Sequence, residues 1–129
     1  MSQAGNQTGH RGEQIAQLFL RQKGFRIEAL NWRWGKNGEI DLVVFHPEVK
    51  LLAFVEVKTR KSLAQGSPQE AVDQKKIHQI LSLAEAYLST HPVSADVSIR
   101  FDVIAIYFPG GAQPANITHI ESAFTSNDA

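Results

Sequence analysis

The sequence predicts a single α/β domain in which a central mixed β-sheet is flanked by helices. Across the 129 residues, the hydrophobic pattern follows the order helix, three strands, helix, strand. Residues 38–45 and 51–58 are apolar enough to be strands buried on both faces of a sheet. A three-strand meander followed by a helical crossover predicts that the fourth strand runs parallel to the third.

The first half of the chain predicts one helix and three strands. Residues 1–8 are polar and are expected to form a disordered tail. A helical pattern over residues 12–23 ends at Gly24, and residues 25–33 predict an edge strand. Asn37-Gly38 is typical of a hairpin turn into a second strand at residues 38–45. The turn at residues 46–48 then leads to a third strand, which ends at about Arg60.

The second half predicts a long helix and a further long strand. Residues 61–68 predict a polar loop, and Pro68 suits the start of a helix over residues 69–89. Residues 97–107 predict the fourth strand, residues 109–111 a turn, and residues 117–120 a short edge strand. Residues 125–129 are expected to be disordered, which leaves residues 9–124 as one domain.

Composition excludes several kinds of site. The absence of cysteine excludes disulfides and thiolate metal sites, and it fits a cytoplasmic protein. Neither an apolar signal segment nor a run of transmembrane length is visible, so no membrane association is expected. The five histidines lack ligand spacing, which argues against zinc. Thirteen basic residues balance thirteen acidic ones, so binding to nucleic acid requires a local cluster of cations.

Ionisable residues near the ends of the second and third strands form the main candidate site. Glu56 and Lys58 are two apart, so strand alternation places them on one face, and Asp41 lies on the neighbouring strand. Buried charges are costly unless they are paired or bind a metal. Carboxylates with the Val57 carbonyl suit Mg²⁺ or Mn²⁺, which would activate water for phosphodiester hydrolysis. The alternative is an Asp solvated at a strand start and a Glu–Lys pair solvated at a strand exit.

These residues resemble the signature of the PD-(D/E)XK nuclease superfamily: Asp41, followed fifteen residues later by Glu56-Val57-Lys58. More narrowly, the chain resembles the YraN-like family of predicted bacterial endonucleases, which is related to Holliday junction resolvases. The resemblance covers roughly residues 9–124 and rests also on Gly12-Glu13, Asn31, residues 38–42, residues 54–60, Lys76 and residues 100–103. It departs at Ile40, where the superfamily name implies a proline that is not a metal ligand.

The resemblance implies a restriction-endonuclease-like core of order α-β-β-β-α-β and a metal-dependent DNA endonuclease, with branched or flapped DNA as candidate substrates. Asp41, Glu56 and Lys58 would be catalytic. Glu13 either assists the metal, as the resemblance implies, or balances the dipole at the N-terminus of the first helix. Lys76 lies on the apolar stripe of the second helix, so it either reaches the carboxylates or extends to the rim of the core.

Cations close to this site predict a DNA-binding surface. The four candidates for phosphate contacts are Arg33, Lys36, Arg60 and Lys61. Trp32 and Trp34 would either stack on bases of single-stranded or branched DNA or pack in the core. Resolvases cut twice as dimers, so the resemblance makes a homodimer a further possibility. Arg100 and Asp102 face the same way on the fourth strand, which favours a structural network over a catalytic role.

Two classes of function therefore remain open. The first is a Mg²⁺-dependent DNA endonuclease, and the second is a catalytically inactive module that binds nucleic acid or protein and keeps the nuclease fold. The complete set of Asp41, Glu56 and Lys58 favours the enzyme. A hydrolase of small phosphoesters is disfavoured, because the sequence has no Gly-rich phosphate loop.

Overall fold

The computed structural model describes residues 4–60, 72–108 and 116–128, with side chains from residue 9 onward. Its elements, in chain order, are α1 (Ala4–Gln22), β1 (Arg26–Arg33), β2 (Glu39–His46), β3 (Leu51–Arg60), α2 (Gln74–Thr90), β4 (Ser98–Tyr107), β5 (Asn116–Ile120) and a 3₁₀ turn (Ser126–Asp128). The predicted α/β class is confirmed. Within the described residues, no helix is long and apolar enough to cross a lipid bilayer.

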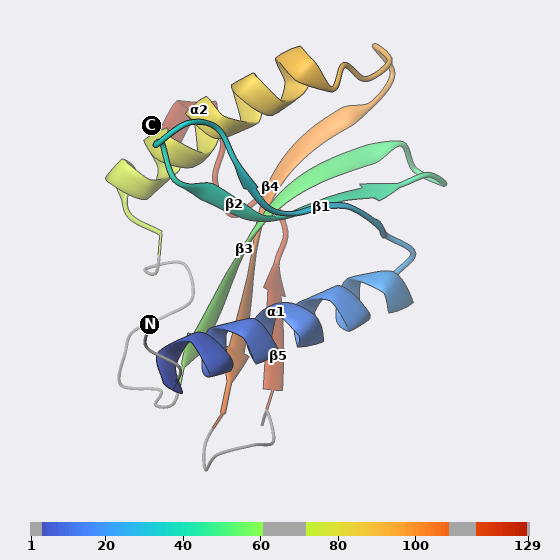
Figure 1. The fold of residues 1–129 in the computed structure, drawn as a ribbon. Helices are drawn as coiled ribbons and strands as arrows, with labels where there is room; N and C mark the ends of the chain where they lie inside the picture. Colours follow the sequence, from blue (N-terminus) through green and yellow to red (C-terminus); the bar gives the residue numbers. More distant parts are fainter. Residues whose placement is uncertain (1–3, 61–71, 109–115, 129) are drawn as a thin grey trace.

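The strands form one mixed sheet in the order β1-β2-β3-β4-β5. β1 to β3 are an antiparallel meander, β4 pairs with β3 in parallel, and β5 closes the far edge antiparallel to β4. The parallel pairing and the short edge strand follow the sequence prediction. Figure 1 shows α1 and α2 on opposite sides of this sheet, which is the restriction-endonuclease-like arrangement.

A hydrophobic layer lies on each face of the sheet, because β2 and β3 place apolar side chains on both sides. On the α1 side, Ala16 and Leu20 pack against strand residues that include Leu42 and Val55. The layer on the α2 side consists of Leu83, Ala84 and Tyr87 of the helix with Ile40, Val43, Leu52 and Phe54 of the strands. Ionisable groups at the ends of β2 and β3 are thereby held between two packed layers.

Gly12 sets how closely α1 approaches the sheet. A Cβ atom on this residue would lie 2.2 Å from Cγ2 of Thr59 on β3, far inside van der Waals contact. Only glycine therefore allows the helix this close to β3 without displacement of the threonine. Because Glu13 is the next residue, the contact also sets the place where its side chain leaves the helix.

The helix boundaries differ from the prediction in two places. α1 begins at Ala4, so residues 4–8 continue the helix where a disordered tail was expected. The segment holds no proline, and its glycine at residue 5 weakens a helix by only about 1 kcal/mol. α2 begins at Gln74 rather than at residue 69, because the side chain of Asp73 caps it by accepting from the backbone N–H of Lys76 at 2.9 Å. Two predicted segments lie outside the described residues: the loop at residues 61–68, which includes Lys61, and the turn at residues 109–111. The predicted start of the second helix, residues 69–71, also lies outside them.

The end of the chain is more ordered than predicted. Residues 126–128 form a 3₁₀ turn in which a carboxylate oxygen of Asp128 accepts from the backbone N–H of Thr125 at 2.7 Å. Phe124 anchors this turn, since it is buried and stacks on Phe101 of β4 with ring centroids 5.2 Å apart. The stacking of Phe124 and the hydrogen bond from the Ala123 N–H to the Phe101 carbonyl, 2.8 Å long, hold this end of the chain against β4.

A buried ion-pair network centred on Asp102 holds β4 and β5 together at the α1 face. Asp102 accepts two hydrogen bonds from Arg100, each of 2.8 Å, and a third from the ring of His119 on β5, also at 2.8 Å. Burial alone would raise the pKa of Asp102, but the hydrogen bonds from His119 and Arg100 hold it below its ordinary value. Because the hydrogen bond from His119 joins neighbouring strands, the network supports the prediction that Arg100 and Asp102 stabilise the fold rather than act in catalysis.

Candidate active site at the fork of β2 and β3

β2 and β3 separate at Asp41, and the candidate site lies in the fork between them. The two strands pair from His46–Leu51 to Leu42–Val55, whereas β3 continues to pair with β4 as far as Arg60–Tyr107. Beyond the last β2 pair, Oδ2 of Asp41 accepts a hydrogen bond of 2.8 Å from the backbone N–H of Val57. Because the N–H and C=O of one strand residue face the same neighbour, the Val57 carbonyl also faces the fork.

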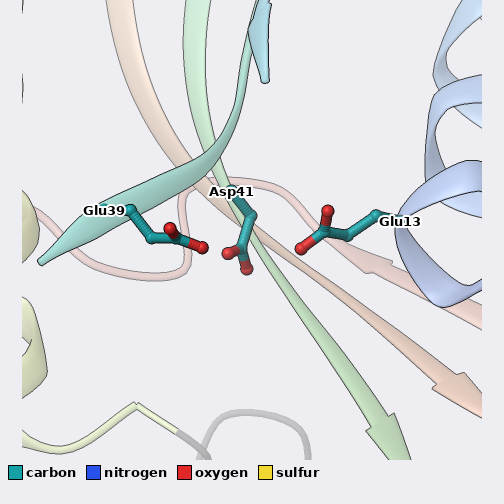
Figure 2. Close-up of side chains that lie close together, drawn as sticks. All are labelled: Glu13, Glu39 and Asp41. Carbon is teal, nitrogen blue, oxygen red and sulfur yellow. The ribbon is translucent and has the colours of Figure 1, made fainter. Parts of the chain in front are cut away.

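Three carboxylates from different parts of the chain converge at Asp41. Figure 2 shows Glu39 and Asp41 of β2 and Glu13 of α1 pointing toward one another, and one oxygen of each lies within 4.8 Å of the others. The Nδ2 group of Asn31 donates to Oε2 of Glu13 at 3.1 Å and to Oε1 of Glu39 at 3.2 Å. Arg33 adds an ion pair to Glu39, with Nη2 2.8 Å from Oε2.

Glu56 brings a fourth carboxylate from β3. Its side chain is buried, with 5 % exposed, and Oε2 lies 3.5 Å from Nζ of Lys58 and 3.7 Å from Nζ of Lys76 on α2. Its other oxygen, Oε1, is buried without a hydrogen-bond partner among the described residues. A buried acceptor left without a partner costs about 1–3 kcal/mol, and more when it is charged. The geometry therefore leaves this oxygen available for a cation.

The electrostatics of Asp41 reflect this crowding of negative charge. Burial, and after it the charge of Glu56, raises the pKa of the Asp41 carboxyl from 3.8 to about 7. The hydrogen bond from Val57 lowers this pKa and the charge of Glu13 raises it further, whereas the charge of Lys76 lowers it. The charge of Lys76 thus offsets the rise in the pKa of Asp41 only in part. A divalent cation in the fork would remove the imbalance.

The donor set fits a hard divalent metal ion. Every candidate ligand is an oxygen: the carboxylates of Asp41 and Glu56, the Val57 carbonyl, and the carboxylates of Glu13 and Glu39. Oxygen-only sites suit Mg²⁺, Mn²⁺ and Ca²⁺ and disfavour softer metals. The cluster of Glu13, Glu39 and Asp41 could hold such an ion. Glu56 is not one of these three residues, but its charge acts on Asp41 and its Oε1 has no hydrogen-bond partner among the described residues.

A basic cleft adjoins the carboxylates on the α2 side. It has a volume of about 340 Å³ and is lined by Lys58, Asp73, Lys75, Lys76 and Gln79. The β1–β2 hairpin meets Gln79 closely, because a Cβ on Gly38 would lie 2.3 Å from Nε2 of this residue. Gly38 also has φ of +97°, a conformation that side chains disfavour. The hairpin thus contacts a residue that lines the cleft.

The structure brings five of the predicted residues into one site: Glu13, Asp41, Glu56, Lys58 and Lys76. Of the predicted DNA contacts, Arg33 pairs with Glu39, and Lys36 is exposed in the β1–β2 turn. Arg60 is the last residue of β3, two residues beyond Lys58, and it lies opposite Tyr107 in the β3–β4 strand pairing. Lys61 lies outside the described residues.

Glu39 and Gln79 are site residues that were not predicted from the sequence. Glu39 had a readable signal, because it is two residues before Asp41 on one strand and so shares its face. Gln79 is three or four residues from the two lysines of α2, the spacing that places helical side chains together. Asn31 is one of the residues on which the family resemblance rests, but no role was predicted for it. In the structure its side chain donates hydrogen bonds to both Glu13 and Glu39.

The mixed sheet between two helices, with acidic side chains at the fork of its central strands, defines a restriction-endonuclease-like α/β domain. The chain belongs to uncharacterised protein family UPF0102, whose family profile matches residues 12–106. The matched segment runs from Gly12 on α1 to Ile106 near the end of β4, and it contains all four carboxylates of the site. This membership confirms the resemblance to YraN-like proteins.

Relatives from several bacteria match almost the entire chain. A UPF0102 protein of Trichlorobacter lovleyi is 46 % identical over 121 residues, which cover 93 % of this chain and 92 % of the relative. A UPF0102 protein of Phocaeicola vulgatus is 40 % identical over 119 residues, which cover 92 % of this chain and 93 % of the relative. A third, from Chlorobium phaeobacteroides, is 41 % identical over 128 residues, covering 96 % and 98 %.

Proposed function

We propose that this protein is a Mg²⁺- or Mn²⁺-dependent DNA endonuclease that hydrolyses phosphodiester bonds at the β2–β3 fork. The observation that carries the proposal is Glu56, a buried carboxylate with one oxygen on two lysines and the other without a partner among the described residues. A carboxylate in this state, beside an Asp41 whose pKa is raised to about 7, is poorly explained by folding alone.

The residues divide into those that hold the metal and those that act on the phosphate. Asp41, Glu56 and the Val57 carbonyl would hold the ion, with Glu13 and Glu39 closing the acidic side. When bound, such an ion neutralises phosphate charge and increases the acidity of water.

The lysines take the second role. Lys58 lines the cleft and is partly exposed, and its Nζ lies 3.5 Å from Oε2 of Glu56, so it can reach both the carboxylate and a phosphate oxygen. A positioned ammonium stabilises the charge that accumulates on the phosphate in the transition state. Lys76 approaches the same carboxylate oxygen from α2 and holds Glu56 in place.

The surroundings of the fork favour a polymer substrate. The cleft opens beside the carboxylates and presents Lys58, Lys75 and Lys76, which suits successive backbone phosphates. Arg33, Lys36 and Arg60, with Lys61 outside the described residues, would extend this surface. Phosphate contacts depend on such local charge rather than on the net charge of zero. The resemblance to resolvases extends the proposal to branched or flapped DNA and, because a junction needs two cuts, to a homodimer.

A cleavage panel tests the proposal. Purified protein is incubated with end-labelled linear, flap and four-way DNA in Mg²⁺, in Mn²⁺ and in chelator, beside the Glu56→Gln variant. We expect cleavage of at least one substrate with metal and none in chelator or with the variant. Metal-independent binding without cleavage of any substrate would instead identify a catalytically inactive nucleic-acid-binding module.

A further inference from the structure

The rings of the β1–β2 hairpin form a stack with one open end. Trp34, at the start of the turn, is 46 % exposed and stacks on Trp32 with ring centroids 5.9 Å apart and planes 17° from parallel. Trp32 in turn packs edge-on against Tyr87 of α2 at 5.2 Å, and Tyr87 is buried in the core on that side. One face of Trp34 is therefore covered by an anchored ring, while much of its surface is exposed to solvent.

The hairpin places this ring beside the proposed site. The preceding residue, Arg33, pairs with Glu39 of the acidic cluster, with Nη2 2.8 Å from Oε2. The carbonyl of Trp34 accepts from the backbone N–H of Asn37, which closes the turn. The following Gly38 packs against Gln79 of the basic cleft. Trp34 thus directly follows the strand residue that forms an ion pair with the acidic cluster.

The chemistry of this surface fits a nucleobase with phosphates on either side. Arg33 and Lys36 flank Trp34 in sequence and are exposed, so cations accompany the exposed ring. A base inside a duplex has both faces covered by its neighbours, whereas an unpaired base offers a face for stacking. Trp34 is also already held by Trp32, which lowers the entropy lost when a base stacks on it.

We propose that the open face of Trp34 stacks an unpaired nucleobase of the DNA, so that the protein prefers DNA with single-stranded nucleotides next to the phosphate at the fork. This inference rests on the proposed endonuclease function, because it specifies the substrate of the same site. It concerns binding rather than hydrolysis, so it can be tested without metal.

The test compares the binding of labelled DNA in the presence of chelator. The ligands are a single strand of about 12 nucleotides, within the range of known single-strand sites, and a blunt duplex of the same length. We expect Trp34→Ala to weaken single-strand binding by roughly 5- to 150-fold, the range for loss of one base–aromatic stack. Trp34→Phe, which keeps a ring, should retain most of the affinity. Leu30→Ala is the matched control, because Leu30 is an exposed apolar residue on β1, the strand that leads to Trp34.

Intrinsic fluorescence gives a second readout on the wild-type protein. Both tryptophans of the chain belong to the stack, so quenching by the unlabelled single strand reports on this surface. We expect strong quenching by the single strand and little by the duplex.

Three results would overturn the inference. The first is equal single-strand affinity of Trp34→Ala and wild type, and the second is an equal loss for single strand and duplex. The third is a shift from dimer to monomer in Trp34→Ala with unchanged DNA affinity, which would make the ring a contact between copies. Single-strand binding that depends on Trp34 in a protein that cleaves nothing would uphold the inference while the endonuclease proposal fails.

Discussion

Replacing Lys58 with alanine should lower the single-turnover rate of DNA cleavage by roughly 10²–10³-fold while the protein remains folded. The ammonium lies 3.5 Å from Glu56 and lines the basic cleft, so it is placed to stabilise charge on the reacting phosphate. Its side chain is 36 % exposed, and Lys76 stays within 3.7 Å of the same carboxylate oxygen after the substitution. The buried charge of Glu56 therefore keeps one cation, and the melting temperature should change by only a few degrees.

Single-turnover kinetics at saturating DNA, with a thermal melt of each variant, checks this expectation. Lys75→Ala is the matched control, because Lys75 lines the same cleft but is exposed and has no ion pair with Glu56. Its loss should weaken DNA binding with little effect on the rate at saturation. Cleavage by Lys58→Ala at the wild-type rate would end the catalytic assignment, and an unfolded variant would show that the lysine is needed for folding.

Replacing Asp41 with asparagine should stabilise the metal-free protein at pH 8. The pKa of Asp41 is raised to about 7 in the folded state, chiefly by burial and by Glu56, whereas its ordinary value is 3.8. The folded state thus binds the proton more tightly than the unfolded state. The contribution of this group to stability is complete below pH 3.8 and is lost as the pH rises through 7.

The size of this effect follows from the pKa difference. The values of 3.8 and about 7 correspond to at most roughly 4 kcal/mol, so we expect Asp41→Asn to raise the free energy of unfolding at pH 8 by about 1–4 kcal/mol. Near pH 4 the two proteins should be almost equally stable, because the protonated Asp41 resembles asparagine.

Denaturant unfolding in chelator at pH 4, 6 and 8 measures the difference. Asp102→Asn serves as the contrasting variant, because the pKa of this buried carboxyl is lowered by its partners and its substitution should destabilise the protein. A wild type as stable as Asp41→Asn at pH 8 would show that the fork carries no excess negative charge.

The fold could be predicted from the sequence where local periodicity decides it. The order of the elements and the parallel pairing of β4 with β3 follow from hydrophobic patterns and connection rules. The approach of Lys58 to Glu56 follows from strand alternation. Lys76 meets the same carboxylate because helix periodicity turns it toward the sheet.

The remainder of the site depends on contacts between elements that no local pattern encodes. Glu13 reaches Asp41 only because Gly12 lets α1 lie against Thr59 of β3. The bridge from Asn31 to Glu13 needs a strand residue with φ of +47°, which asparagine tolerates better than most residues.

The boundaries of elements were the weakest part of the prediction. Pro68 suggested an early start to α2, but the helix begins after Asp73, whose side chain supplies the cap. At the other end of the chain, Ala4 begins α1 within a stretch whose polar composition indicated disorder.

Calorimetric titration of the metal-free protein with Mn²⁺ tests most directly whether the carboxylates at the fork hold a divalent ion. We predict binding to the wild type, loss of binding in Asp41→Asn and Glu56→Gln, and full binding in Asp96→Asn, an exposed carboxylate paired with Lys50. The expected losses follow because each of the two variants removes a charged oxygen ligand. Binding of equal strength in the wild type and all three variants would contradict the account, since the ion would then be held elsewhere.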